Sequence, residues 1–228
     1  MPRRRRAGQN IRELALRRRM RAIAAFVQAG LVLFSPLLLA KFLDNFWRQL
    51  PSSESETQPS LQLPLFYIFA VVVSLYLIAQ GIFLWKRANN ADQGAIGEEE
   101  IAQEMIQLEQ DGWQIDYGLR LGKGDVDIVC TSPRDKTYVI DVKSHRGEVI
   151  ADREQLRRRM GKTTYGFEKN FLSQAMRQAI QIKELRNLSF VTPVIVFSSA
   201  RVSVPNGKLK NVYVVEKSRL VSLLRSLG

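Results

Sequence analysis

Two aspartates and a lysine stand inside stretches whose other residues are typical of buried β-strands. Asp127 lies in GDVDIVCT (residues 124–131), and Asp141 and Lys143 lie in KTYVIDVK (residues 136–143). Burying an ionised side chain costs on the order of several kcal/mol unless the charge is paired or holds a metal ion. Charged residues at these strand positions therefore indicate a functional site, in which the charges are paired or hold a metal ion.

Alternation along a strand predicts how these side chains meet. Successive side chains point to opposite faces, so Asp141 and Lys143 share a face. A hairpin through the turn at residues 132–135 can bring Asp127 beside both. Neighbouring carboxylates repel each other and take up protons unless a cation lies between them. Hard oxygen ligands favour Mg²⁺ or Mn²⁺, so we expect a divalent metal site here.

Two helical segments add polar groups. In residues 94–110, helical spacing places Glu98 at the centre of the apolar face, aimed at the sheet as a third carboxylate. In residues 170–187, Gln174 and Gln178 lie within the apolar face and need hydrogen-bonding partners. The alternative interpretation of Asp141 and Lys143 is a common solvent-facing ion pair without catalytic meaning.

The elements that must position these side chains begin near residue 91. Asn89 and Asn90 predict a short linker, and residues 91–228 form one domain. We expect strands over 113–121, 124–131 and 136–143, a buried central strand over 191–198, and a last strand and helix. We expect the single histidine, His145, in a solvent-facing loop. The fold class predicted is α/β, with a mixed β-sheet flanked by helices.

Five segments resemble the nuclease-related domain family (NERD) in order and approximate spacing: GAIGEE, GKGDVDIV, YVIDVKSHRGEV, NFLSQ and PVIVFSS, within residues 92–200. The resemblance implies a restriction-endonuclease-like fold of the PD-(D/E)XK superfamily and hydrolysis of DNA or RNA with Mg²⁺ or Mn²⁺. It implies a catalytic set of Glu98, Asp127, Asp141, Lys143 and Gln174. Within this set, Asp127, Asp141 and Glu98 would bind the metal.

The sequence departs from the family pattern at three places. Asp141 stands where glutamate is more frequent, Ile128 where histidine is frequent, and Phe171 where proline often follows the asparagine that opens the helix. These departures leave open how a substrate is recognised.

A basic stretch between the last motifs is a candidate nucleic-acid-binding surface. Tyr165 and Phe167 lie among its charges, so it could contact phosphates and stack bases. The alternative is a solvated loop with no partner. The six basic residues are Arg153, Arg157, Arg158, Arg159, Lys162 and Lys169.

Two uncharged segments, residues 22–40 and 63–85, are each long enough to cross a bilayer. We expect transmembrane helices over 22–43 and 63–85, joined by an external loop over 44–62. Residues 1–21 hold nine arginines and one glutamate, so the positive-inside rule predicts a basic cytoplasmic tail and a cytoplasmic domain over 91–228. The alternative is a pair of buried core helices.

The leading hypothesis is a membrane-anchored, metal-dependent nuclease whose partners are nucleic acid and the lipid bilayer. The alternative is a non-catalytic nucleic-acid-binding or protein-interaction domain tethered to the membrane. The net charge of +12 is compatible with either partner. The sequence carries no signal for an oligomeric state.

Overall fold

The computed structural model describes residues 7–49, 63–121 and 124–228. The chain divides into two compact units. The sheet unit joins the N-terminal residues up to Glu13 with Ala91–Gly228, and the helical unit is Leu14–Asn90. Most of the external loop and the first residues of the basic tail, both predicted from the sequence, lie outside the described residues.

Two long helices, α1 (Gln9–Gln49) and α2 (Leu63–Gln110), extend from one unit into the other. The linker predicted at Asn89 and Asn90 is wrong, because the backbone there remains helical. Residues 86–93 contain neither proline nor glycine, and two asparagines cost a helix well under about 1 kcal/mol each. The boundary between the units nevertheless follows Asn90.

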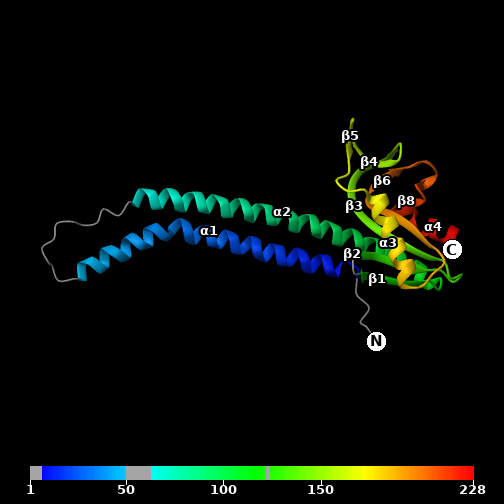
Figure 1. Cartoon of the computed structure of the whole chain (residues 1–228), viewed down its shortest axis with the longest axis horizontal. Coiled ribbons are helices and arrows are strands. Elements are labelled where there is room, and N and C mark those ends of the chain that lie inside the picture. The colour runs from blue at the N-terminus through cyan, green and yellow to red at the C-terminus, as the bar shows by residue number, and fades with distance from the viewer. Residues whose placement is uncertain (1–6, 50–62, 122–123) are drawn as a thin grey trace. The chain divides into compact units, whose positions relative to one another are not determined.

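In the helical unit, α1 and α2 lie side by side and antiparallel (Figure 1). Their contact is lined by small residues, among them the buried Ala25 and Ala29 of α1 and Ala70 of α2. Ser74 Oγ donates to the carbonyl oxygen of Ala29 at 2.9 Å. A side chain at Gly81 would overlap the ring of Phe26. Small residues let helix backbones approach closely, which is typical of helices packed in membranes.

Both helices are long and apolar enough to cross a membrane, over Ile11–Phe46 and Pro64–Gln110. Their large apolar side chains are mostly exposed, including Leu31, Phe34 and Phe69. The core helices of a soluble protein bury such side chains. The exposure therefore does not support the alternative of buried core helices.

The sheet unit is built on one mixed sheet with the strand order β1-β2-β3-β6-β8-β7. Neighbours β1, β2 and β3 are antiparallel, β3, β6 and β8 are parallel, and β7 is antiparallel to β8. Beyond this path, β4 pairs with β3 and β5 pairs with β4. The strands are β1 (Gln114–Leu121), β2 (Gly124–Thr131), β3 (Thr137–Asp152), β4 (Gln155–Met160), β5 (Thr163–Gly166), β6 (Val191–Ser203), β7 (Lys208–Leu209) and β8 (Val212–Glu216).

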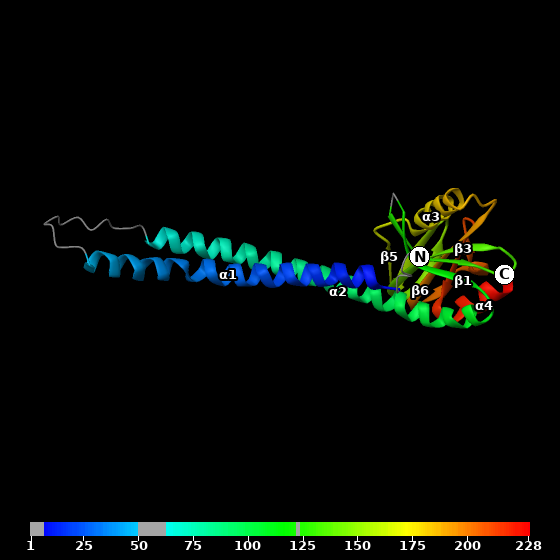
Figure 2. The same ribbon diagram turned by 90° about the horizontal axis from the view of Figure 1, so that it is seen from below.

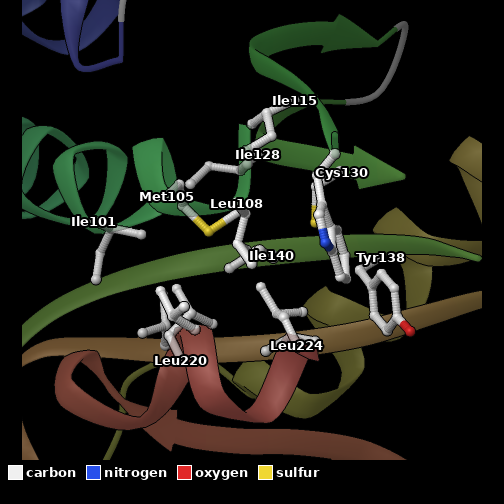
Figure 3. Packing of buried hydrophobic residues seen from close by; sticks show 14 of the residues in the cluster. Ile101, Met105, Leu108, Ile115, Ile128, Cys130, Tyr138, Ile140, Leu220 and Leu224 are labelled. Atoms are coloured by element: carbon white, nitrogen blue, oxygen red, sulfur yellow. The ribbon is translucent and has the colours of Figure 1, made fainter. Parts of the chain in front are cut away.

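Helices cover both faces of this sheet. Figure 2 shows α3 (Phe171–Leu185) on one side and α4 (Lys217–Leu227) with the end of α2 on the other. A short 3₁₀ turn, η1 (Pro205–Gly207), precedes β7. Side chains of α2 and α4 meet the sheet in the main core (Figure 3), where Met105 and Leu108 face Ile140, Leu220 and Leu224. Cys130, the only cysteine of the chain, is fully buried in the same cluster.

The predicted mixed sheet flanked by helices is confirmed, and so is a central strand beginning at Val191, since β6 lies between β3 and β8. The basic stretch, for which a solvated loop is the alternative interpretation, forms the end of β3 and the hairpin of β4 and β5. Three consecutive arginines in β4 hide the usual alternation of apolar and polar residues. His145 lies half-buried in β3, so its predicted place in a solvent-facing loop is wrong.

Candidate active site

The site begins where the ladder between β2 and β3 stops. The last pair is Ile128 with Ile140, and β4 joins the same edge of β3 only from Glu148. Asp127 and Asp141 come directly after that last pair, where the strands separate. Asp127 Oδ2 accepts a hydrogen bond of 2.8 Å from the backbone N–H of Val142, a donor left free by the missing ladder. The hairpin therefore brings the two aspartates to one opening, as the sequence predicts.

Asp141 is the most deeply buried acid of this opening, with 1% of its surface exposed. Lys143 Nζ lies 2.9 Å from its Oδ1 and 2.7 Å from its Oδ2. Gln174 Nε2, from the first turn of α3, donates to Oδ1 at 3.2 Å. Two donors from different elements thus compensate the burial of the carboxylate. The solvent-facing ion pair proposed as the alternative does not fit this burial.

Lys143 is held from a second side by α3. Its Nζ lies 4.8 Å from the centre of the Phe171 ring, and 15% of its side chain is exposed. Asn170 caps α3 by accepting a hydrogen bond from the N–H of Ser173, which fixes the start of the helix and the place of Phe171. The departure at position 171 therefore places a ring against the ammonium group.

Glu98 reaches the same region from α2, as its position on the apolar face predicts. It is 8% exposed, and Oε2 accepts a hydrogen bond of 2.9 Å from the backbone N–H of Gly8. The preceding Gly97 packs against β3 and β6, since an added Cβ would lie 2.8 Å from Ser198 Oγ and 3.1 Å from Ser144 Cβ. A glycine here lets the helix approach the strands that carry Asp141.

Neighbouring acidic charges raise the pKa of two of the three carboxylates, Asp127 and Glu98. Burial raises the pKa of Asp127 well above its ordinary value, and the charges of Asp141 and Glu98 raise it further. Burial also raises the pKa of Asp141, although Lys143 lowers it. For Glu98, burial raises the pKa, the hydrogen bond from Gly8 lowers it, and the charge of Asp141 raises it. Negative charge is therefore crowded around one lysine.

Within the described ranges, no group of three or more histidine, cysteine, aspartate or glutamate side chains stands ready to hold a metal ion. The donor set still fits a divalent cation, because the hard carboxylate oxygens of Asp127, Asp141 and Glu98 lie in one region, where the charges of Asp141 and Glu98 raise the pKa of Asp127. Buried Asp141 Oδ2 has no well-directed hydrogen-bond donor, although Lys143 Nζ is near.

Residues 93–198 match the family model described as the nuclease-related domain (NERD). This segment is therefore similar to the nuclease-related domain family. The match covers α2 from residue 93 through most of β6, and so includes every predicted catalytic residue. The strands and helix from β7 onward, and most of the helical unit, lie outside it.

Among solved structures, one similar to the chain is a repair endonuclease from Pyrococcus abyssi, with 16% sequence identity and a TM-score of 0.30. The similarity covers 45% of this chain and 38% of that protein, so the chain spans well under half of its length. A search of curated proteins gives no match.

The predicted nucleic-acid-binding residues lie around the hairpin of β4 and β5. Arg157 pairs with Asp152 at 2.9 Å, and Arg159 pairs with Glu148 at 2.5 Å. The other four form no ion pair with the described residues of the chain: Arg153 at the turn before β4, Arg158 in β4, Lys162 in the next turn and Lys169 just before α3. The chain thus neutralises only part of the basic stretch.

Two contributors to this region were not among the predicted site residues. Gln178, one turn after Gln174 on α3, is 8% exposed and its Nε2 donates to the carbonyl oxygen of Asp125 at 2.9 Å. A second glutamine on the apolar face was a signal for it. Gly8 was missed because its contact with Glu98 joins residues 90 positions apart, and nothing local to it marks the pairing.

Proposed function

We propose that the chain is a membrane-anchored nuclease that hydrolyses phosphodiester bonds of DNA or RNA with Mg²⁺ or Mn²⁺ at the cytoplasmic face. The observation that supports it most is the buried Asp141 held by Lys143 and Gln174 beside Asp127, inside a nuclease-related domain. A buried, crowded carboxylate pair is costly to keep in a fold without a cation to balance it.

Each residue has a distinct role in this proposal. Asp127 and Asp141, completed by Glu98, would hold the divalent ion, which when bound polarises the phosphodiester and lowers the pKa of a water molecule. Lys143 would orient the attacking water and stabilise charge that develops on the phosphate oxygens. Gln174 would keep the Asp141 carboxylate in its orientation through the hydrogen bond to Oδ1.

The helical unit supports the anchoring part of the proposal. Two helices are long enough to span a bilayer and expose their apolar side chains. The arginines before the first span and Lys86 and Arg87 after the second favour cytoplasmic ends, with the loop over 44–62 outside. Under this proposal the transmembrane helices cover 22–43 and 63–85, and the cytoplasmic domain covers 91–228.

The test is cleavage by the full chain purified in detergent. Labelled single-stranded, duplex and branched DNA and RNA are incubated with Mg²⁺, Mn²⁺ or EDTA. We expect metal-dependent cleavage that falls at least about 100-fold in Asp141→Asn and Lys143→Ala. Asp116→Asn is the matched control, because Asp116 lies on β1 and pairs with Arg186, outside this site. Folded wild-type protein that cleaves nothing, or variants that cleave at the wild-type rate, would refute the nuclease.

A non-catalytic tethered domain is the second candidate. The observation that favours it is that no three metal-ligating side chains converge among the described residues, while Lys143 Nζ donates to Oδ1 of Asp141 and lies 2.7 Å from its Oδ2. This candidate predicts salt-dependent binding of nucleic acid, or binding of a protein partner, with no turnover under any metal condition.

A further inference from the structure

The two faces of the hairpin formed by β4 and β5 differ in charge balance. We call this hairpin, residues 155–166, the basic hairpin. On one face, Arg157 pairs with Asp152 and Arg159 pairs with Glu148, which also accepts a hydrogen bond of 2.6 Å from Ser203. Both cations of this face are therefore neutralised within the chain.

Alternation places Arg158 on the opposite face, where the register sets it directly across from Tyr165. The side chain of Arg158 has no hydrogen bond or ion pair with any described residue, and 48% of Tyr165 is exposed. Directly opposed side chains of an antiparallel pair lie about 5 Å apart at Cβ. A half-buried arginine without an ion-pair partner thus lies opposite an exposed aromatic residue in the hairpin.

The same face continues toward the acidic site. Leu156, two residues before Arg158, is buried in the cluster that contains Phe171. The Phe167 ring lies 4.7 Å from that of Phe171 and 5.1 Å from that of His145. Phe171 in turn contacts Lys143. Burial lowers the pKa of His145, and the positive charge of Arg158 lowers it further, which indicates that the arginine lies near the aromatic cluster.

The buried side chains of Leu156 and Phe171 thus lie between the Arg158–Tyr165 pair of the hairpin and the candidate catalytic lysine. Phosphates of any nucleic acid would satisfy Arg158. The ring of Tyr165 is different, because bases present their flat faces only when they are not stacked in a duplex. The combination therefore favours an unpaired strand over a double helix.

We infer that the Arg158–Tyr165 face of the basic hairpin binds single-stranded nucleic acid and directs it to Asp141 and Lys143. A phosphate contacts Arg158 and a neighbouring base stacks on Tyr165. The inference rests on the proposed function for what happens at the end of this path, and it assigns the substrate class. DNA and RNA share the phosphate and the base face, so the experiment includes both.

The experiment measures binding with cleavage abolished. Full-length Asp141→Asn protein in detergent, with EDTA present, is titrated into fluorescent single-stranded DNA, single-stranded RNA and a duplex, and anisotropy is recorded. Arg158→Gln and Tyr165→Leu are each expected to weaken single-strand binding about tenfold. Tyr165→Phe keeps the ring and is expected to restore it. Arg158→Gln also lowers the salt dependence of binding by about one released counterion.

Arg157→Gln and Arg159→Gln are the matched comparisons, since they remove the same charge from the opposite face. We expect them to weaken binding by less than about threefold, because these cations are already paired. Equal losses from both faces, or a Tyr165→Leu loss that is the same for duplex and single strand, would overturn the inference. Circular dichroism of each variant confirms that the hairpin variants are folded.

The two proposals fail separately. Face-specific binding of single strands without any cleavage by the wild-type chain would sink the nuclease and leave this surface standing. Metal-dependent cleavage that is insensitive to Arg158→Gln and Tyr165→Leu would leave the nuclease standing and remove this surface.

Discussion

The backbone N–H of Gly8 donates a hydrogen bond of 2.9 Å to Oε2 of Glu98, across 90 residues of sequence. Gly8 has φ 73°, and a Cβ there would lie 2.9 Å from the carbonyl oxygen of Ala95. One turn later, Arg12 donates to both carboxylate oxygens of Glu99, each at 2.6 Å. The segment that precedes the first apolar span therefore holds the helix that carries a candidate metal ligand.

Gly8→Ala should destabilise this contact. Alanine is strained at a positive φ and lacks space against Ala95, so we expect the free energy of unfolding to fall by about 1 to 2 kcal/mol. Denaturant unfolding of the full chain in detergent measures it. Gly166→Ala is the control, because nothing lies within 4 Å of its Cβ and its φ is not positive. A loss no greater than that of the control would contradict the importance of this contact.

Gly97→Ala should reduce activity without touching a candidate catalytic group. The new methyl group meets Ser198 Oγ at 2.8 Å and Ser144 Cβ at 3.1 Å, so α2 must move away from the strands. We expect a loss of about 1 to 3 kcal/mol in stability and a lower kcat. Adding Ser198→Ala removes the closest atom and should restore part of both. If the double variant is no better than Gly97→Ala alone, the steric explanation is wrong.

The acidic site should make the metal-free protein less stable as pH rises. Burial raises the pKa of Asp127, Asp141 and Glu98, so the folded state binds protons more tightly than the unfolded state does. The stability penalty is absent below the ordinary values, 3.8 for Asp and 4.5 for Glu, and grows as pH rises through the raised values.

Asp127→Asn removes one of these charges and keeps an acceptor for the N–H of Val142. We expect the variant to be more stable than the wild type at pH 8 by about 1 kcal/mol or more, with the difference shrinking toward pH 4. Urea unfolding with EDTA at several pH values measures this difference. A variant that is less stable than wild type at pH 8 would show that Asp127 serves the fold and not a cation.

Mn²⁺ should offset the loss of stability that the buried carboxylates cause in the wild type. A ligand that binds only the folded state at 100 times its Kd adds about 2.7 kcal/mol. We expect the melting temperature to rise with Mn²⁺ concentration in the wild type and to stay constant in Asp141→Asn. Ca²⁺ serves as a comparison ion of the same charge. Equal shifts in both proteins would place the bound ion elsewhere.

The order of elements in the sheet unit could be predicted because most of them carry a clear period. Strand β6 begins with a mainly apolar run, residues 191–197, and the pattern of α2 places Glu98 on its buried face. The hairpin between β2 and β3 follows from a turn whose Ser132 Oγ accepts from the N–H of Lys136. Asp127, Asp141 and Lys143 could be predicted as site residues because burying ionised side chains inside strands costs free energy.

Other features depend on pairings that no local pattern encodes. The strand β4 could not be predicted, because its arginines form ion pairs with acidic residues of β3 that are distant in sequence. Arg159, for example, pairs with Glu148, 11 residues away. The opening along β3 lies between the end of its pairing with β2 and the start of its pairing with β4, and no local pattern marks either point. Asn89 and Asn90 predict a linker because asparagine has a weak helix propensity. Two such residues do not end a helix, and α2 continues through them.

The burial of Cys130 has a practical consequence for orientation in the membrane. Its thiol is enclosed in the core, and burial raises its pKa, so alkylating reagents have no reactive sulfur in the folded wild type. A single cysteine introduced at Ser53 or Ser222 would be the only group that a membrane-impermeant maleimide can modify. Labelling of the first and not the second in intact cells would establish which compartment each side faces, with no native residue to remove beforehand.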